Sequence, residues 1–182
     1  NLAKAFVGEC QARNRYTFYA KTAKKEGYEK ISAIFLETAE QEREHAKWLF
    51  RLINELKQKS GAEKYNPINI ETDVETTLGT TKENLKSAIN GESHEYESMY
   101  PEFAKIAEEE GLAEIATRLK FIAIAEKHHK ERYVKLLTEL ENNSVFKKEE
   151  EVVWVCRNCG YVHTGKETPE ECPSCSHPQA YF

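Results

Sequence analysis

The sequence has no long hydrophobic run and no cluster of basic residues. No apolar stretch approaches the roughly 18 residues of a membrane-spanning helix, and no charged-then-apolar signal segment opens the chain. The formal net charge is -5 over 182 residues, whereas nucleic-acid binding would need clustered Lys and Arg. We therefore expect a cytoplasmic protein with no membrane and no nucleic acid as partner.

Cysteine is scarce, with five residues in the chain. Four of them form two Cys-x-x-Cys pairs near the C-terminus: Cys156, Cys159, Cys172 and Cys175. In a reducing compartment this spacing predicts a four-thiolate metal site rather than disulfides, and such a site can fold a module that has little core of its own. Zinc is the usual structural metal, whereas iron could also pass single electrons. Cys10 stands apart, and we expect it to be a small apolar residue on a packed helix.

The hydrophobic period predicts two pairs of long helices, each pair broken by a glycine. The helices cover approximately residues 2–26, 29–58, 82–110 and 112–141, with breaks at Gly27 and Gly111. Residues 60–80, between the pairs, show no helical period. About twenty extended residues at roughly 3.3 Å each can run the length of a 30-residue helix, which rises about 45 Å. We therefore predict an all-α ferritin-like four-helix bundle with a long crossover over residues 1–146.

The remaining residues, 147–182, are predicted to form a small metal domain with short β-strands. The charged run at 147–151 indicates a solvated hinge, and the apolar run at 152–155 indicates the start of a strand.

The pattern Glu-x-x-His occurs twice, at residues 42–45 and 126–129. A preceding helix carries further glutamates in each half: Glu9 in the first, and Glu92 with Glu95 in the second. Side chains at i and i+3 share a helix face, so each motif offers a carboxylate that can bridge two ions and an imidazole that binds one of them. The repeat therefore indicates a site for two metal ions.

These residues fall on the apolar stripes of their helices, where leucine would be expected. The stripes are Leu2, Ala5, Glu9, Ala12, Tyr16, Tyr19 and Ala23; Ile31, Phe35, Thr38, Glu42, His45, Leu49, Leu52 and Leu56; Leu85, Ala88, Glu92, Glu95, Met99, Phe103 and Ile106; and Ile115, Leu119, Ile122, Glu126, His129, Tyr133, Leu136 and Leu140. Buried carboxylates without partners cost several kcal/mol each. Because the stripes hold no Lys or Arg, the cluster needs metal cations.

The number of carboxylates favours a redox-active metal. Two divalent ions are neutralised by Glu9, Glu42, Glu92 and Glu126, and Glu95 becomes useful when both ions are trivalent. Mixed oxygen and imidazole ligands suit iron or manganese better than zinc, and a mixed pair stays open. His94 and His128 neighbour these ligands but fall on other faces, so we expect them to be exposed or to lie outside the ligand shell.

The whole chain resembles the rubrerythrin family, in which a ferritin-like di-iron bundle precedes a rubredoxin-like domain. The matching stretches are residues 8–14, both Glu-x-x-His motifs, 91–96, 99–101 and 156–182. The additional Glu95 separates this family from ferritins, and the four-cysteine module separates it from most other di-iron bundles.

The resemblance implies a peroxidase that reduces hydrogen peroxide to water in defence against oxidative stress. It implies two iron ions in the bundle and one iron in the rubredoxin-like site, where zinc is the alternative. Electrons would come from a donor such as rubredoxin and its NAD(P)H-dependent reductase. A head-to-tail homodimer would place one subunit's rubredoxin-like iron near the partner's di-iron site.

The resemblance also suggests roles for individual residues near the irons. Glu95 and His45 would exchange as ligands of one iron when its oxidation state changes. Tyr16 and Tyr100 match tyrosines that hydrogen-bond the glutamate ligands, although packing in the aromatic core would explain both equally well.

Two other interpretations stay open. A ferritin-type ferroxidase, which handles iron for storage, would assemble into a large shell, and a non-catalytic scaffold with structural zinc would be colourless. A dimer or a higher homo-oligomer is compatible with the sequence, and so is exchange of helices between subunits through the 60–80 linker.

Overall fold

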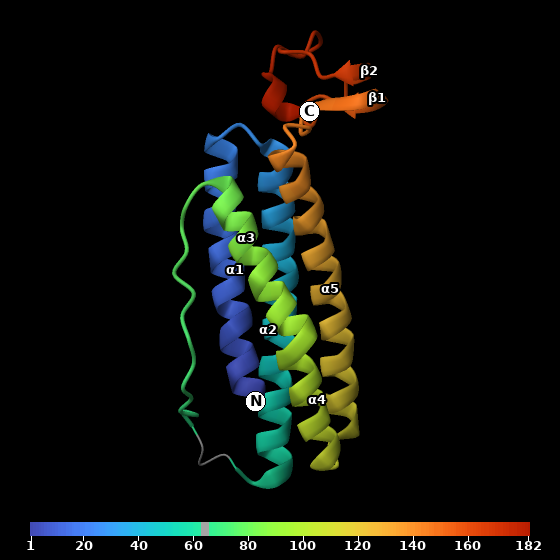
Figure 1. Cartoon of the computed structure of the whole chain (residues 1–182). Helices are drawn as coiled ribbons and strands as arrows, with labels where there is room; N and C mark the ends of the chain where they lie inside the picture. The colour runs from blue at the N-terminus through green and yellow to red at the C-terminus, as the bar shows by residue number, and fades with distance from the viewer. Residues whose placement is uncertain (63–65) are drawn as a thin grey trace.

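The computed structural model describes residues 1–62 and 66–182 and consists of a helical bundle with a small β module at one end (Figure 1). The helices of the bundle are α1 (Leu2–Lys25), α2 (Glu29–Ser60), α3 (Thr81–His94), the π-helical segment η1 (Glu95–Met99), α4 (Tyr100–Glu109) and α5 (Ala113–Glu141). One hairpin consists of α1 and α2. The other consists of α3, η1 and α4, which follow one path, packed against α5. In the part of the chain that is described, no helix is both long and apolar enough to cross a membrane.

A long crossover joins the two hairpins. After α2 the chain returns along the outside of α1, and residues 66–80 have no regular secondary structure (Figure 1). Gln11 donates a hydrogen bond to the carbonyl of Asp73 (3.1 Å), and the Tyr19 hydroxyl donates to the carbonyl of Thr77 (2.9 Å). Because of this return, α2 and α3 run in the same direction, and the predicted ferritin-like topology is confirmed. Residues 63–65 of the predicted linker lie outside the described residues.

Glycines end the helices where the sequence predicts. Gly27 and Gly111 have φ values of 85° and 76°, which place them in the left-handed region that follows a helix C-terminus. At the other end of the crossover, Thr80 and Glu83 form a reciprocal capping box that starts α3. The two hairpin turns and the start of the third helix are therefore encoded locally.

Two buried clusters fill the bundle. The cluster nearer the β module is aromatic and includes Tyr16, Tyr19, Phe35 and Tyr133. The other is mainly aliphatic and includes Leu49, Leu52, Ile115, Leu119 and Ile122 together with Tyr100. The predicted metal ligands lie between them. The stripes predicted for the first, second and fourth helices are buried or half-buried along their whole length.

The stripe predicted for the third helix is only half-buried beyond Glu95, where Met99 and Phe103 pack against the edge of the aliphatic cluster. Met99, Phe103 and Ile106 are half-buried, and the fully buried positions are the next residues along, Tyr100, Ala104 and Ala107. The π-helical segment explains the difference, because a turn closed by i to i+5 hydrogen bonds holds one more residue than an α-turn. The buried face of α4 is therefore shifted by one residue.

The C-terminal module contains a two-stranded antiparallel sheet, β1 (Lys147–Val155) and β2 (Val162–Glu167), and the short 3-10 helix η2 (Gln179–Tyr181). Residues 147–151 are mostly exposed, as predicted, but the prediction of a hinge is wrong because these residues belong to β1. The pairing with β2 is irregular between Lys147 and Val152, and Lys148 forms an ion pair of 3.0 Å with Glu139 of α5. The charged segment is therefore the first part of a strand, and an ion pair with α5 holds it in place.

Candidate metal centres

Six side chains from four helical segments converge in the middle of the bundle and form two overlapping groups. The first group is Glu9, Glu42, His45 and Glu126, and the second is Glu42, Glu92, Glu126 and His129. Within each group the candidate ligand atoms all lie within 4.8 Å of one another. Because Glu42 and Glu126 belong to both groups, their carboxylates can bridge two metal ions.

The distances show a nearly symmetric arrangement around the two shared carboxylates. His45 Nδ1 lies 3.0 Å from Glu42 Oε2 and 2.9 Å from Glu126 Oε1. His129 Nδ1 lies 3.0 Å from Glu42 Oε1 and 2.8 Å from Glu126 Oε2. Each shared glutamate therefore turns one oxygen toward each histidine, as expected of carboxylates that bridge two ions.

Buried polar atoms without partners show that these residues fit cations. Glu9, Glu42, Glu92 and Glu126 are at most 1% exposed. Both oxygens of Glu126, one oxygen of each of the other three glutamates, and His129 Nδ1 are buried without a hydrogen-bond partner. Leaving charged groups in this state is costly, whereas two metal ions would satisfy them. The mixed oxygen and imidazole donors suit iron or manganese.

Without metal, the pocket holds protons. Burial, followed by the charge of Glu42, raises the pKa of Glu9 to about 7, and burial likewise raises the pKa of Glu92 well above its usual value. For His129, burial opposes the charged form, but the carboxylates of Glu126, Glu42 and Glu92 around the imidazole outweigh it and raise the pKa to about 12. Metal ions would therefore displace protons when they bind.

Two buried tyrosines hold the outer glutamates in place. Tyr16 donates a hydrogen bond to Glu92 Oε1 at 2.5 Å, and Tyr100 donates to Glu9 Oε1. Both hydrogen bonds predicted from the resemblance are present. Each fixes one oxygen of a terminal carboxylate and leaves the other near a histidine: Glu9 Oε2 lies 3.7 Å from His45 Nδ1, and Glu92 Oε2 lies 3.3 Å from His129 Nδ1.

Glu95 is buried beside the two groups but belongs to neither. A Cβ atom added to Gly8 would lie 4.0 Å from Glu95 Oε1, so the carboxylate lies against α1 at this glycine. Burial, then the charges of Glu9 and Glu92, raises its pKa well above the usual range. Glu95 is also the first residue of the π-helical segment. The structure thus places Glu95 near Glu9 and places His45 in the ligand group.

A surface hollow of about 210 Å³ reaches His45 and is lined also by Trp48, Arg118, Phe121 and Ile122. The Arg118 guanidinium lies 3.9 Å from the centre of the Trp48 ring. The sequence analysis missed this opening. A usable signal was present, because Trp48 follows His45 by three residues and shares its helix face.

The residues that were predicted to stand apart do so. His94 and His128 are exposed, and Cys10 is half-buried on α1.

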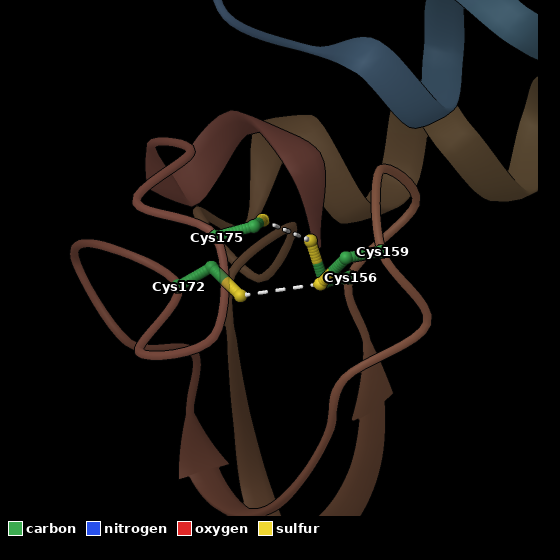
Figure 2. Close-up of side chains that lie close together, drawn as sticks. All are labelled: Cys156, Cys159, Cys172 and Cys175. Atoms are coloured by element: carbon green, nitrogen blue, oxygen red, sulfur yellow. Dashed lines mark hydrogen bonds between the residues drawn. The ribbon is translucent and has the colours of Figure 1, made fainter.

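The four C-terminal cysteines converge from two loops of the β module (Figure 2). Cys156 Sγ lies 3.8 Å from Cys175 Sγ, and Cys159 Sγ lies 3.7 Å from Cys172 Sγ. A tetrahedron of sulfurs around a metal with bonds of about 2.3 Å has edges of about 3.8 Å. The four thiols therefore fit one tetrahedral metal ion, iron or zinc.

Backbone N–H groups in the two loops favour thiolates. The N–H of Tyr161 lowers the pKa of the Cys159 thiol, and the N–H of His177 lowers the pKa of the Cys175 thiol. Burial raises the pKa of Cys172 to about 11, which a bound cation would reverse. The loops thus offer two thiols that ionise readily and one that needs the metal.

Comparisons with known proteins agree with this geometry. Residues 1–137 match the family model for rubrerythrin, and residues 154–182 match that for the rubrerythrin rubredoxin-like domain. A putative rubrerythrin of Methanocaldococcus jannaschii is 61% identical, with 100% of this chain and 89% of that protein covered. A rubrerythrin of Porphyromonas gingivalis is 50% identical, with 100% and 86% covered.

Among solved structures, mixed-valent nigerythrin superposes with a TM-score of 0.66 at 31% identity, covering 100% of this chain and 83% of that one. The match in sequence and the match in fold both extend over the bundle and the four-cysteine module. The chain belongs to the rubrerythrin family.

Proposed function

We propose that the protein reduces hydrogen peroxide to water at its di-iron site, with electrons delivered through the rubredoxin-like iron. The observation that supports this most is the presence of two different metal sites in one chain. One is a buried carboxylate site for two ions, and the other is a tetrahedral thiolate site that can pass single electrons when it holds iron. Storage of iron would not require the second site.

The di-iron site would contribute two electrons from two ferrous ions, which is the number needed to cleave one O–O bond. The protein's own residues would give peroxide access to the site and keep the ligands oriented. The hollow at His45 gives a small molecule access to one end of the site. Tyr16 and Tyr100 keep Glu92 and Glu9 oriented while charge changes at the metals.

Glu95 and His45 would exchange as ligands during turnover. In the structure His45 is in the ligand group, while Glu95 lies beside it, close to Glu9. A carboxylate is the better ligand for a ferric ion, because it adds a negative charge where one positive charge has been gained. We therefore propose that Glu95 binds the oxidised iron and that His45 binds the reduced one.

Replacing Glu95 tests this role. Glu95→Ala should keep the iron content close to that of the wild type, because both complete groups remain, but should slow the consumption of peroxide by at least about tenfold. The matched control is Glu97→Ala, which removes an exposed glutamate from the same π-helical segment. Unchanged peroxide turnover in Glu95→Ala would refute the exchange.

A visible spectrum tests the activity as a whole. Iron in four thiolates should give a red protein whose absorption bands bleach on reduction and return after addition of hydrogen peroxide. A colourless protein, or a reduced protein that peroxide does not reoxidise, would defeat the peroxidase proposal.

Electron transfer between subunits is the second part of the proposal. From His129 to Glu141, α5 rises about 18 Å at 1.5 Å per residue, and the β module that carries the cysteines lies beyond that end (Figure 1). A head-to-tail homodimer would shorten this path. Apolar surfaces are present on both parts: Val153, Val155 and Val162 on the module, and Trp48 with Phe121 beside the hollow.

Mixed dimers can separate transfer within a chain from transfer between chains. Coexpression of Cys172→Ser, which lacks a working thiolate site, with Glu126→Gln, which lacks a working bundle site, should restore peroxide turnover that neither variant has alone. The same two variants prepared separately and mixed without subunit exchange serve as the control. An inactive coexpressed dimer would argue for transfer within one chain.

A ferritin-type ferroxidase is the alternative function. It predicts a large shell in size-exclusion chromatography and no dependence on the cysteines, whereas our proposal predicts a dimer or small oligomer. We further propose that the electron donor is a rubredoxin with its NAD(P)H-dependent reductase. A cytoplasmic location forms part of the proposal, because four thiolates stay reduced there.

A further inference from the structure

The two tyrosines that hold the outer glutamates have different surroundings. Tyr100 lies in the aliphatic cluster, and among the described residues no aromatic ring pairs with it. Tyr16 lies in the aromatic cluster, with its ring centre 6.1 Å from that of Tyr19 and 5.4 Å from that of Tyr133. Only one side of the metal site therefore has further phenols in contact with a ligand-bonded tyrosine.

Tyr19 connects this aromatic cluster to the outside of the bundle. Its ring is buried (1% exposed), but its hydroxyl donates to the carbonyl of Thr77 and lies 3.1 Å from Ser87 Oγ. Thr77 belongs to the crossover, and both Thr77 and Ser87 are partly exposed. A continuous line of contacts thus runs from Glu92 through Tyr16 and Tyr19 to the surface.

Phenols in contact can carry single electrons, because a phenol is more easily oxidised than a phenylalanine ring or an aliphatic side chain, and because electron transfer slows steeply with distance. The neighbouring Phe35 packs against both Tyr16 and Tyr19 but lacks the hydroxyl that makes oxidation easy. We propose that Tyr16 and Tyr19 form an electron relay that drains an excess oxidising equivalent from the metal site to the bundle surface at the crossover.

The relay rests on the proposed function, since hydrogen peroxide is the oxidant. It acts when a further peroxide reacts before the thiolate site has re-reduced the metals. Reduction of that peroxide to water takes two electrons and two protons, which the relay supplies in two passes of one electron and one proton each. Tyr16 then gives one electron to the oxidised metal site and its phenolic proton to Glu92 along their hydrogen bond, which leaves a neutral tyrosyl radical. Tyr19 gives one electron to this radical, the proton returns from Glu92 to Tyr16, and the phenolic proton of Tyr19 leaves to water near Thr77. A one-electron reductant such as ascorbate restores Tyr19 with one electron and one proton.

The experiment uses the full chain loaded with ferrous iron. The sample is mixed with excess hydrogen peroxide without an electron donor, frozen at intervals and examined by electron paramagnetic resonance. The wild type should give a tyrosyl radical that ascorbate removes quickly. Tyr16→Phe should give no radical, whereas Tyr19→Phe should retain a radical at Tyr16 that ascorbate removes much more slowly.

Tyr133→Phe is the matched control. Tyr133 is as buried as Tyr19 and contacts the same Tyr16 ring, but its hydroxyl makes no hydrogen bond to the crossover among the described residues. Its replacement should leave the radical and its removal by ascorbate as in the wild type.

Several results would overturn the relay. If peroxide oxidises the reduced wild type, seen in its visible absorption, but no tyrosyl radical forms, the relay is wrong while the proposed function stands. A radical that persists in Tyr16→Phe, or removal by ascorbate that slows in Tyr133→Phe rather than in Tyr19→Phe, also refutes it. If peroxide does not oxidise the reduced protein, the proposed function fails and the relay fails with it.

Discussion

The two metal sites differ in how much folded structure surrounds them. The bundle site lies between two clusters of buried side chains, none of which is a ligand candidate. The hydrophobic cluster of the β module consists of Trp154, Cys156, Cys172 and Phe182, so two of its four members are themselves candidate ligands.

This difference suggests opposite relations between metal and folding. In the bundle, burial of apolar side chains can stabilise the helices before any metal binds. In the module, the metal takes the place of a hydrophobic core. Metal should therefore add function to a fold in the first case and complete the fold in the second.

The largest effect is expected in the module. Cys172→Ser should abolish metal binding there and unfold residues 147–182, because a structural four-ligand site contributes on the order of 10 kcal/mol to folding. Loss of the red colour and of dispersed NMR signals from the module would show this, while the helical circular dichroism of the bundle remains. Cys10→Ser, outside both sites, should change neither. A folded module without metal would contradict the comparison.

The second largest effect is expected when one of the two glutamates shared by both ligand groups loses its charge. Glu126→Gln keeps the shape of the side chain but removes a charge from both ligand groups, so the iron content of the bundle should fall from two per chain toward zero. The melting temperature of the metal-free bundle should change by less than about 5 °C. Glu114→Gln, at an exposed position of the same helix, is the control. Unfolding of the bundle in Glu126→Gln would mean that its fold depends on metal after all.

A smaller effect is expected from pH on the metal-free protein. The raised pKa values of Glu9 (about 7) and His129 (about 12) mean that the folded bundle binds more protons than the unfolded chain near neutral pH. Stability contributed by Glu9 is present below its unfolded pKa of about 4.5 and is lost as the pH rises through 7. His129 contributes below about 6.5 and loses this contribution as the pH rises toward 12. Thermal unfolding of chelated protein should therefore show a lower melting temperature at pH 8 than at pH 5.

Iron-loaded protein should show the reverse trend, because the ligands must be deprotonated to bind metal. Equal melting temperatures at the two pH values in the chelated protein would indicate that the buried carboxylates are not the source of its pH dependence.

The smallest effect concerns one backbone angle in the second cysteine loop. Ser176 has a φ of 54°, in the left-handed region that favours glycine. Ser176→Gly should stabilise the metal-loaded module by up to about 1 kcal/mol, measured as the denaturant concentration at which the red colour is lost. The opposite change at the equivalent position of the first loop, Gly160→Ala, should destabilise it by about 1 kcal/mol. Destabilisation by Ser176→Gly would mean that the serine side chain contributes more than its backbone strain costs.

Much of the bundle could be predicted because each helix repeats one period. Glu9, Glu42 and Glu126 occupy positions on apolar stripes, and an acid in such a position is visible from the sequence alone. The crossover was predictable for a similar reason, since its length matches the helix that it must pass.

Two features of the fold could not be predicted, because no repeating pattern in the sequence encodes them. The π-helical segment adds one residue to a turn, and the assumption of a constant period therefore put Met99 on the buried stripe in place of Tyr100. The charged residues after Phe146 predicted a hinge, because charged side chains usually face solvent. Lys148 instead forms an ion pair with Glu139 of α5. This pairing depends on how the chain turns between α5 and β1, which the composition of the charged run does not show.

The crossover is the covalent connection between two hairpins that share the bundle metal site. Each ligand group takes side chains from both hairpins: Glu9, Glu42 and His45 come from the first, and Glu92, Glu126 and His129 from the second. In the part of the chain that the structure describes, residues 66–80 form the peptide link between these two halves. If that link were cut, the two apolar clusters shared by the hairpins would still hold two separate polypeptides together, and bound metal would strengthen their association. The same arrangement makes the protein a natural starting point for a split reporter whose association strengthens in response to iron.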